Sequence, residues 1–253
     1  MKTLIIAAIR CFLLFLAPSV TYAISAQWDL DPISRNWNTA ANWTPMGIPN
    51  GAADTATFGL SNTTNVSISA DTEVNAITFT SAATNPYTIT ARPGLTLTIS
   101  GVGIVNNSGT TQNFVTDSDT AGHIKFANNA TAGNGTAFTN SGSVEFSNTS
   151  VEFFNSSTAG SATFTNEGGV TFNDTSSAAN GIFNNSGGTT FFQGSSTAGN
   201  ATFVNNGGGT IFFNSSTAGN ATITNKGATP STPEGGTLFS FTSTAGSATI
   251  NNN

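Results

Sequence analysis

The sequence predicts an all-β solenoid, a stack of similar coils that are each built from short strands. Three observations lead to this fold class. A tetrapeptide close to "STAG" returns along the second half of the chain, and apolar residues keep a fixed distance from it. The segments between these markers alternate apolar with polar residues, as half-buried strands do. A period of about 20 residues is typical of solenoids and differs from that of propeller blades or helical arrays.

The first 23 residues have the features of a secretory signal peptide. Lys2 and Arg10 are the only charged residues, most of the others are apolar, and the segment ends in Thr21-Tyr22-Ala23. A transmembrane helix needs ~20 apolar residues in a row, and Arg10 and a later proline interrupt this run. We therefore predict that residues 1–23 are removed after export and that the mature chain begins at Ile24.

The mature chain would have an unusual composition. Cys11 is lost with the signal peptide, so no cysteine remains for disulfides. The mature chain then contains four basic and twelve acidic residues, which gives a net charge of −8. Because no basic patch is expected, the sequence predicts no nucleic-acid binding and no membrane insertion by this segment. Charged residues make up 7% of the chain, and Asn, Ser, Thr and Gly take their place.

Residues 24–60 differ in composition from the rest of the chain and contain all three tryptophans, Trp28, Trp37 and Trp43. Two interpretations remain open for them. Either they plug the end of the solenoid as a Trp-rich N-terminal cap, or they are partly exposed anchors for a partner or a sugar ring. Residues 61–253 are predicted to form the solenoid with degenerate repeats, which are clearest over 131–253.

The register of the repeats predicts which side chains point inward. The marker residue stands at intervals of 27, 19, 20, 20 and 27 residues, at Thr131, Thr158, Ser177, Thr197, Thr217 and Thr244. Six residues later comes a large apolar column, namely Phe164, Phe183, Phe203, Ile223 and Ile250. A small residue lies two positions before each of these, and an asparagine lies two positions after it, at 166, 185, 205, 225 and 252. We predict that all three columns face inward and that the asparagines form a hydrogen-bonded ladder.

A second strand precedes each marker and carries a single or doubled phenylalanine, at Phe153-Phe154, Phe172, Phe191-Phe192 and Phe212-Phe213. A doubled Phe on a strand puts one ring inside and one outside. Glycine clusters at 168–169, 187–188 and 207–209 are expected at corners that need positive φ. The two longer intervals hold a duplicated "SVEF", starting at Ser143 and Ser150, and a loop at Lys226–Gly236, which are the expected places for variable function.

No residues are predicted to be catalytic, cofactor-binding or metal-binding, so the chain is expected not to be an enzyme. His123 has Asp117 and Asp119 near it in sequence, but nothing else converges on it. Glu145 and Glu152 look like a carboxylate pair, yet the "SVEF" duplication accounts for them. Metal-binding cysteine or histidine clusters are missing from the sequence.

Two alternatives to a structural or adhesive role stay open. A polysaccharide-degrading enzyme on a β-helix would need acidic residues clustered with Arg or Lys on one face, whereas the basic residues here are scattered in sequence and are expected on separate coils. An ice-binding solenoid would present aligned threonines. The column one residue before the large apolar positions is mostly threonine and faces outward, at Thr163, Ile182, Thr202, Thr222 and Thr249.

Several segments together resemble the passenger region of bacterial autotransporter-like surface proteins that carry autotransporter-associated β-strand repeats. These are "WNTAANWTP…GIPNGAADTATF", "VNAITF…YTIT…LTLTISGVGIVNNSG" and "STAGNATFVNNGG". The resemblance implies a right-handed parallel β-helix, secretion to the cell surface or the outer membrane, and a structural or adhesin role. The partners it implies are a host or surface glycan, a protein ligand, or a second copy of the chain. The chain departs from the family in showing no membrane-barrel strands.

Overall fold

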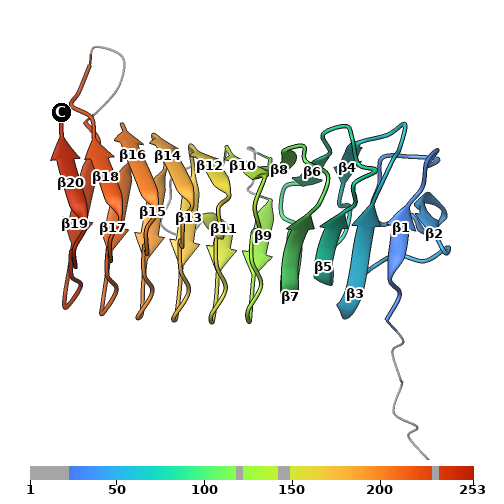
Figure 1. Ribbon diagram of the computed structural model, residues 1–253, viewed down its shortest axis with the longest axis horizontal. Helices are drawn as coiled ribbons and strands as arrows, with labels where there is room; N and C mark the ends of the chain where they lie inside the picture. The colour runs from blue at the N-terminus through green and yellow to red at the C-terminus, as the bar shows by residue number, and fades with distance from the viewer. Residues whose placement is uncertain (1–22, 118–121, 142–148, 230–233) are drawn as a thin grey trace, which may run out of the picture.

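The computed structural model describes residues 23–117, 122–141, 149–229 and 234–253 (Figure 1). The first 22 residues of the predicted signal peptide, Asp119, and Ser143 and Glu145 of the first "SVEF" copy lie outside the described residues. The described chain is a β-solenoid of about eight turns with almost no helix, as the repeats predicted. Two parallel sheets run along its long axis, and each successive coil adds a strand to both (Figure 1).

Sheet A contains eleven of the described strands, and all but β2 pair in parallel. Its strands are β1 (Ala26–Trp28), β2 (Trp43–Thr44), β3 (Gly51–Phe58), β5 (Thr72–Phe79), β7 (Thr96–Asn106), β9 (His123–Phe126), β11 (Thr149–Phe153), β13 (Gly169–Phe172), β15 (Thr189–Phe192), β17 (Gly209–Phe212) and β19 (Gly236–Phe239). At the N-terminal end, β2 pairs with β1 in the antiparallel sense after the short 3-10 helix η1 (Ala40–Asn42).

Sheet B contains nine of the described strands, all parallel. They are β4 (Asn65–Ser67), β6 (Thr88–Ala91), β8 (Gln112–Thr116), β10 (Thr136–Asn140), β12 (Thr163–Asn166), β14 (Ile182–Ser186), β16 (Thr202–Asn206), β18 (Thr222–Asn225) and β20 (Thr249–Asn252). The segment before η1 adds to this sheet, because Asn36 forms a parallel bridge with Ser67.

The marker residues form a third, narrow line of contact between coils. Single parallel bridges join Thr131, Thr158, Ser177, Thr197, Thr217 and Thr244 in succession. The marker hydroxyl also accepts a hydrogen bond from the amide two residues later, as Thr197 Oγ1 does from Gly199 N at 3.0 Å. Gly199 has φ +62°, and a Cβ there would lie 2.9 Å from the Ala179 carbonyl oxygen. The "STAG" motif is therefore a corner that requires glycine.

The predicted positive-φ corners are confirmed in part. Gly187 and Gly207 have φ values of +89° and +76°, whereas the other glycines of the three clusters keep negative or extended φ. Positive φ was predicted at the paired glycines, whereas the positive φ of the marker glycine was not predicted. The marker glycine follows a hydroxyl residue by two positions in each of the repeats at 158, 197, 217 and 244, and that spacing was the available signal.

The coils are about 24 residues long, so the predicted length of about 20 holds for only part of the chain. Successive rungs of the inward polar column, from Thr116 to Asn252, are separated by 24, 26, 19, 20, 20 and 27 residues. Extra residues sit in corners and bulges, such as the register shift where the long strand β7 pairs with β5. Corner insertions leave the ladders intact and thus lengthen a coil without disturbing the core.

Two columns of stacked phenylalanine rings fill the core. In sheet A, consecutive centroids lie 4.5–4.9 Å apart, from Phe126 through Phe153, Phe172, Phe192 and Phe212 to Phe239. In sheet B they lie 4.5–5.0 Å apart, from Phe114 through Phe138, Phe164 and Phe183 to Phe203. Rings of the two columns meet edge to face, a favourable arrangement for aromatic pairs, as with Phe192 and Phe203 at 5.8 Å and 80°. The inward phase predicted for Phe203 is confirmed.

The predicted asparagine ladder is also confirmed. Nδ2 of each asparagine donates to Oδ1 of the next one along the axis, from Asn140 to Asn252, at 2.8–3.0 Å. The Asn205 amide is fully used: its Nδ2 also donates to the Gly236 carbonyl oxygen, and its Oδ1 also accepts from Thr210 Oγ1. Such pairing removes the cost of burying amides next to a stacked aromatic core.

The N-terminal end is closed by a different kind of packing. Trp28, Trp37 and Trp43 are at most 2% exposed and pack around Phe58, with ring centroids 5.0–6.2 Å apart. Each indole N–H donates to a backbone carbonyl oxygen. Of the two interpretations of the tryptophans, the structure supports the plug, because fully buried rings have no surface to offer a partner.

Candidate binding sites

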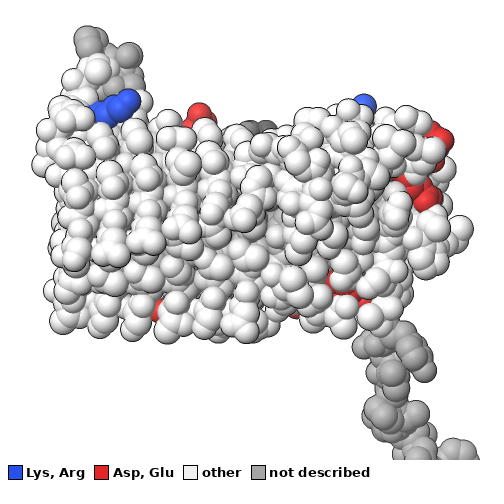
Figure 2. All heavy atoms as spheres, viewed as in Figure 1, with Lys and Arg blue, Asp and Glu red and all other residues white. Residues whose placement is uncertain are grey.

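The outer face of sheet B presents two uncharged columns of side chains. The first is Asn65, Thr88, Asn113, Ala137, Thr163, Ile182, Thr202, Thr222 and Thr249, and the second is Ser67, Thr90, Val115, Thr139, Thr165, Asn184, Val204, Thr224 and Asn251. All are exposed or half-buried. The molecule in Figure 2 is likewise almost white, and the few charged side chains visible in this view lie near its two ends and along its edges.

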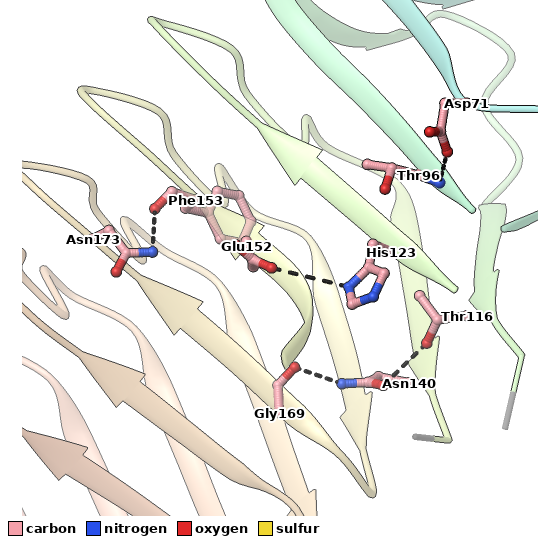
Figure 3. Close-up of polar contacts among 9 residues, drawn as sticks. All are labelled: Asp71, Thr96, Thr116, His123, Asn140, Glu152, Phe153, Gly169 and Asn173. Carbon is pink, nitrogen blue, oxygen red and sulfur yellow. Dashed lines mark hydrogen bonds and ion pairs between the residues drawn. The ribbon is translucent and has the colours of Figure 1, made fainter. Parts of the chain in front are cut away.

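The outer face of sheet A carries a small charged cluster. Lys125 and Glu152 are register partners on β9 and β11. His123 Nδ1 lies 4.0 Å from Glu152 Oε1 (Figure 3), which is too long for a hydrogen bond. Lys125 Nζ lies 5.8 Å from the centroid of the Phe154 ring, within range of a cation–π contact. His123, Lys125 and Glu152 thus form a small electrostatic cluster on the outer face of sheet A.

The other contacts in Figure 3 are structural. Asp71 accepts a hydrogen bond from the Thr96 amide at 2.9 Å, and Asn173 Nδ2 donates to the Phe153 carbonyl oxygen at 3.4 Å. Asn140 donates to the Gly169 carbonyl oxygen and accepts from Thr116 Oγ1, which begins the inward amide column. These bonds hold neighbouring coils in register.

Two arginines that are far apart in the sequence, Arg35 and Arg92, line one depression. The bridge between Asn36 and Ser67 places Arg35 beside β4, where the Arg35 carbonyl oxygen accepts from the Ser67 amide at 2.9 Å. Ser67 pairs with Thr90, and Arg92 follows two residues later. Arg35 and Arg92 therefore meet across two coils. The expectation that the basic residues lie on separate coils holds, but the inference that they stay apart is wrong for this pair.

The depression has a volume of about 270 Å³ and also contains Asp117. Asp117 lies beside Arg92, because its amide donates to the Ala91 carbonyl oxygen at 3.2 Å. Neither guanidinium forms an ion pair or donates a hydrogen bond within the part of the chain that the structure describes. The remaining lining comes from Asn65, Val66, Ser67 and Thr90. We call this depression the arginine pocket.

The arginine pocket has the chemistry to bind an acidic group that carries hydroxyls. Guanidinium groups form forked, charge-assisted hydrogen bonds with carboxylates, sulfates and phosphates. The Asp117 carboxylate only accepts hydrogen bonds when ionised, so it suits a ligand that also has donors. Hydroxyl and amide side chains at the rim supply both donors and acceptors. An acidic sugar unit meets all three requirements.

The remaining groups that the sequence suggested as places of variable function form no further site among the described residues. The first "SVEF" copy lies outside the described residues, and only the ends of the Lys226–Gly236 loop are described. Phe191, the outward ring of its doublet, is 7% exposed. Over the ranges the structure describes, no group of three or more His, Cys, Asp or Glu side chains is placed to hold a metal ion. None of the described helical residues forms a span long and apolar enough to cross a membrane.

Comparisons with protein-family models, with curated proteins and with solved structures found no match for this chain. The class of protein is therefore defined by its own geometry, as a two-sheet parallel β-solenoid with stacked aromatic and asparagine columns.

Proposed function

We propose that this chain is an exported, non-enzymatic β-solenoid that serves as a structural or adhesive segment at the cell surface, in the manner of an autotransporter passenger. The main observation in support of this proposal is that the columns of rings and asparagines continue from one coil to the next. Stacked rings and paired amides run from coil to coil in the same register. Such an array makes a stiff rod that keeps its ends apart, which suits a spacer or a displayed surface.

The arginine pocket supports the adhesive part of the proposal. Acidic polysaccharides are common at cell surfaces and carry the anionic and hydroxyl groups that Arg35, Arg92 and Asp117 would recognise together. The pocket opens beside the uncharged face of sheet B, whose hydroxyls and amides offer weak contacts to further sugar units. We propose polyuronate as the ligand class, with the pocket as the anchor.

The test uses the full chain expressed with its own N-terminal residues in a Gram-negative host. We expect the protein in the exported fraction and expect the purified mature form to bind immobilised polygalacturonate. Arg92→Gln should weaken that binding about fivefold to tenfold, because it removes one charge-assisted contact at a partly solvated site. Lys226→Gln makes the same charge change outside the pocket and should leave binding unchanged.

Two outcomes would contradict the proposal. Retention of the protein in the cytoplasm would refute export. Equal loss of binding in the Arg92 and Lys226 variants would show a diffuse charge effect in place of a site. Release of reducing ends from polygalacturonate would instead favour the enzyme alternative.

The ice-binding alternative receives no comparable support. Ile182 and Val204 interrupt the two outward columns, and Asn184 and Asn251 replace further threonines. Measurement of thermal hysteresis would decide it, and we expect none.

A further inference from the structure

Ile24, the residue that would follow the predicted signal peptide, is held at its backbone nitrogen, while its side chain is half exposed and lies against Gly47. Its backbone nitrogen donates to Asp54 Oδ1 at 2.6 Å. Its Cγ2 lies 2.5 Å from the point where a Cβ on Gly47 would stand, so a larger residue at position 47 would have to displace this side chain. The next residue is fixed as well, since Ser25 Oγ accepts from the Thr55 amide at 3.0 Å.

Asp54 is a carboxylate in an unusual setting. It is 5% exposed and accepts two backbone hydrogen bonds, from Ile24 and from the Asn50 amide at 2.9 Å. No Lys or Arg side chain among the described residues forms an ion pair with it. A buried carboxylate normally requires a cationic partner, because two neutral donors offset only part of the cost of leaving water.

We propose that Asp54 is the receptor for the mature N-terminus. Hydrolysis of the Ala23–Ile24 peptide bond by a signal peptidase consumes one water, leaves a carboxylate on Ala23 and creates an amine on Ile24. That amine takes up a proton and forms the missing ion pair with Asp54. The inference rests on the proposed export, because it needs the signal peptide to be cleaved at this bond.

The surroundings of Asp54 and Ile24 have room for a charged N-terminus. Ala23, Ile24, Ile48, Asn50, Gly51 and Asp54 border a depression of about 610 Å³, which has room for a terminal ammonium and its water. Strand β1 begins two residues after Ile24 and leads directly to Trp28 in the plug. The ion pair would therefore fasten the strand that carries the first buried tryptophan, and processing would complete the closed end of the solenoid.

The test compares two forms of the chain that both begin at Ile24, one with a free amine and one with that amine acetylated. Asp54→Asn should lower the Tm of the free-amine form by about 4–8 °C and that of the acetylated form by less than half as much. Asp71→Asn is the matched control, since Asp71 is an exposed carboxylate that also accepts from one backbone amide, that of Thr96. Its effect should be the same in both forms.

Equal Tm shifts for Asp54→Asn in the two forms would overturn the proposal, because Asp54 would then serve only the neutral N–H. If Asp54→Asn fails to fold, acetylation of the unaltered chain decides the question: a lowered Tm supports the ion pair and an unchanged Tm refutes it. N-terminal sequencing of exported protein should find Ile24 first, and any other start would also overturn it. A chain that stays in the cytoplasm would refute export alone, while the Tm comparison would still decide the role of Asp54.

Discussion

The two ends of the described solenoid are built on different principles. Near the N-terminus, different kinds of side chain pack together in an arrangement that is not repeated. Three tryptophans, Phe58 and Tyr87 pack at varied angles, and Tyr87 donates a hydrogen bond to the Gly59 carbonyl oxygen. From β11 to β20, the same side chains recur in each coil, with rings nearly parallel and amides joined head to tail. The stability of the plug therefore depends on how well its side chains fit one another in shape, whereas the stability of the repeats depends on the register between neighbouring coils.

This difference predicts how each region tolerates damage. A substitution in the plug removes a contact that nothing else supplies. A substitution in a column removes one rung, and its cost should depend on whether the rung is bonded on both sides.

The largest effect is expected in the plug. Trp37→Ala should lower the free energy of unfolding by about 4–5 kcal/mol, since it empties a fully buried ring site and leaves its neighbours unable to collapse. Chemical denaturation with a tryptophan-independent probe such as circular dichroism would measure it. A loss under about 1 kcal/mol would mean that the ring is not part of the core.

The aromatic columns should show a smaller, graded effect. Phe203→Ala, between Phe183 and Ile223 on sheet B, should cost about 3–4 kcal/mol, and Phe239→Ala, half-buried in the last coil, about 1–2 kcal/mol. Thr202→Ala, on the same strand as Phe203 but facing outward, should cost under about 0.5 kcal/mol and serves as the control. Similar losses for Phe203 and Thr202 would mean that the strand phase is wrong.

The asparagine ladder gives a third comparison. Asn205→Leu removes hydrogen bonds to rungs on both sides and should cost about 2–3 kcal/mol. Asn252→Leu removes one acceptor and should cost about 1 kcal/mol or less. Both values can be read from urea unfolding curves, and equal costs would argue that the ladder contributes no cooperativity along the axis.

The smallest effect concerns pH and belongs to the N-terminal region. Burial raises the pKa of the Tyr87 hydroxyl to about 12, with the neighbouring Ser61 hydroxyl opposing the shift. The folded state then keeps a proton that the unfolded state releases near pH 10, so this contribution to stability is lost as pH rises from about 10 to 12. Tyr87 is the only tyrosine after the predicted cleavage site. Ultraviolet difference absorption would therefore report its titration alone, and a midpoint near pH 10 would contradict its burial.

The difference between repeated and unrepeated regions also explains which parts of the structure could be predicted from the sequence. The inward phase of Phe203 and Asn205 was predictable, because each position recurs at nearly equal intervals and selects the same side-chain type. The arginine pocket was not predictable in this way. Arg35 and Arg92 belong to coils of unequal length, and their meeting depends on the single bridge between Asn36 and Ser67.

Asp54 and Ile24 were missed for a related reason. Their contact joins a loop before β1 to the middle of β3, and neither residue belongs to a repeated position. Sequence periodicity identifies what every coil shares, and the candidate sites lie where the coils differ. The coil length was underestimated for the same reason, since it was taken from the most regular repeats.

Hydrogen–deuterium exchange along the mature chain would test the central claim most directly. If the plug closes one end and each coil is held by its neighbours, exchange should be slowest in β3, β5 and β7 and should become faster toward β19 and β20, whose outer edges pair with no other described strand. Uniform protection from β3 to β20, or faster exchange at the tryptophan-filled end, would contradict the account.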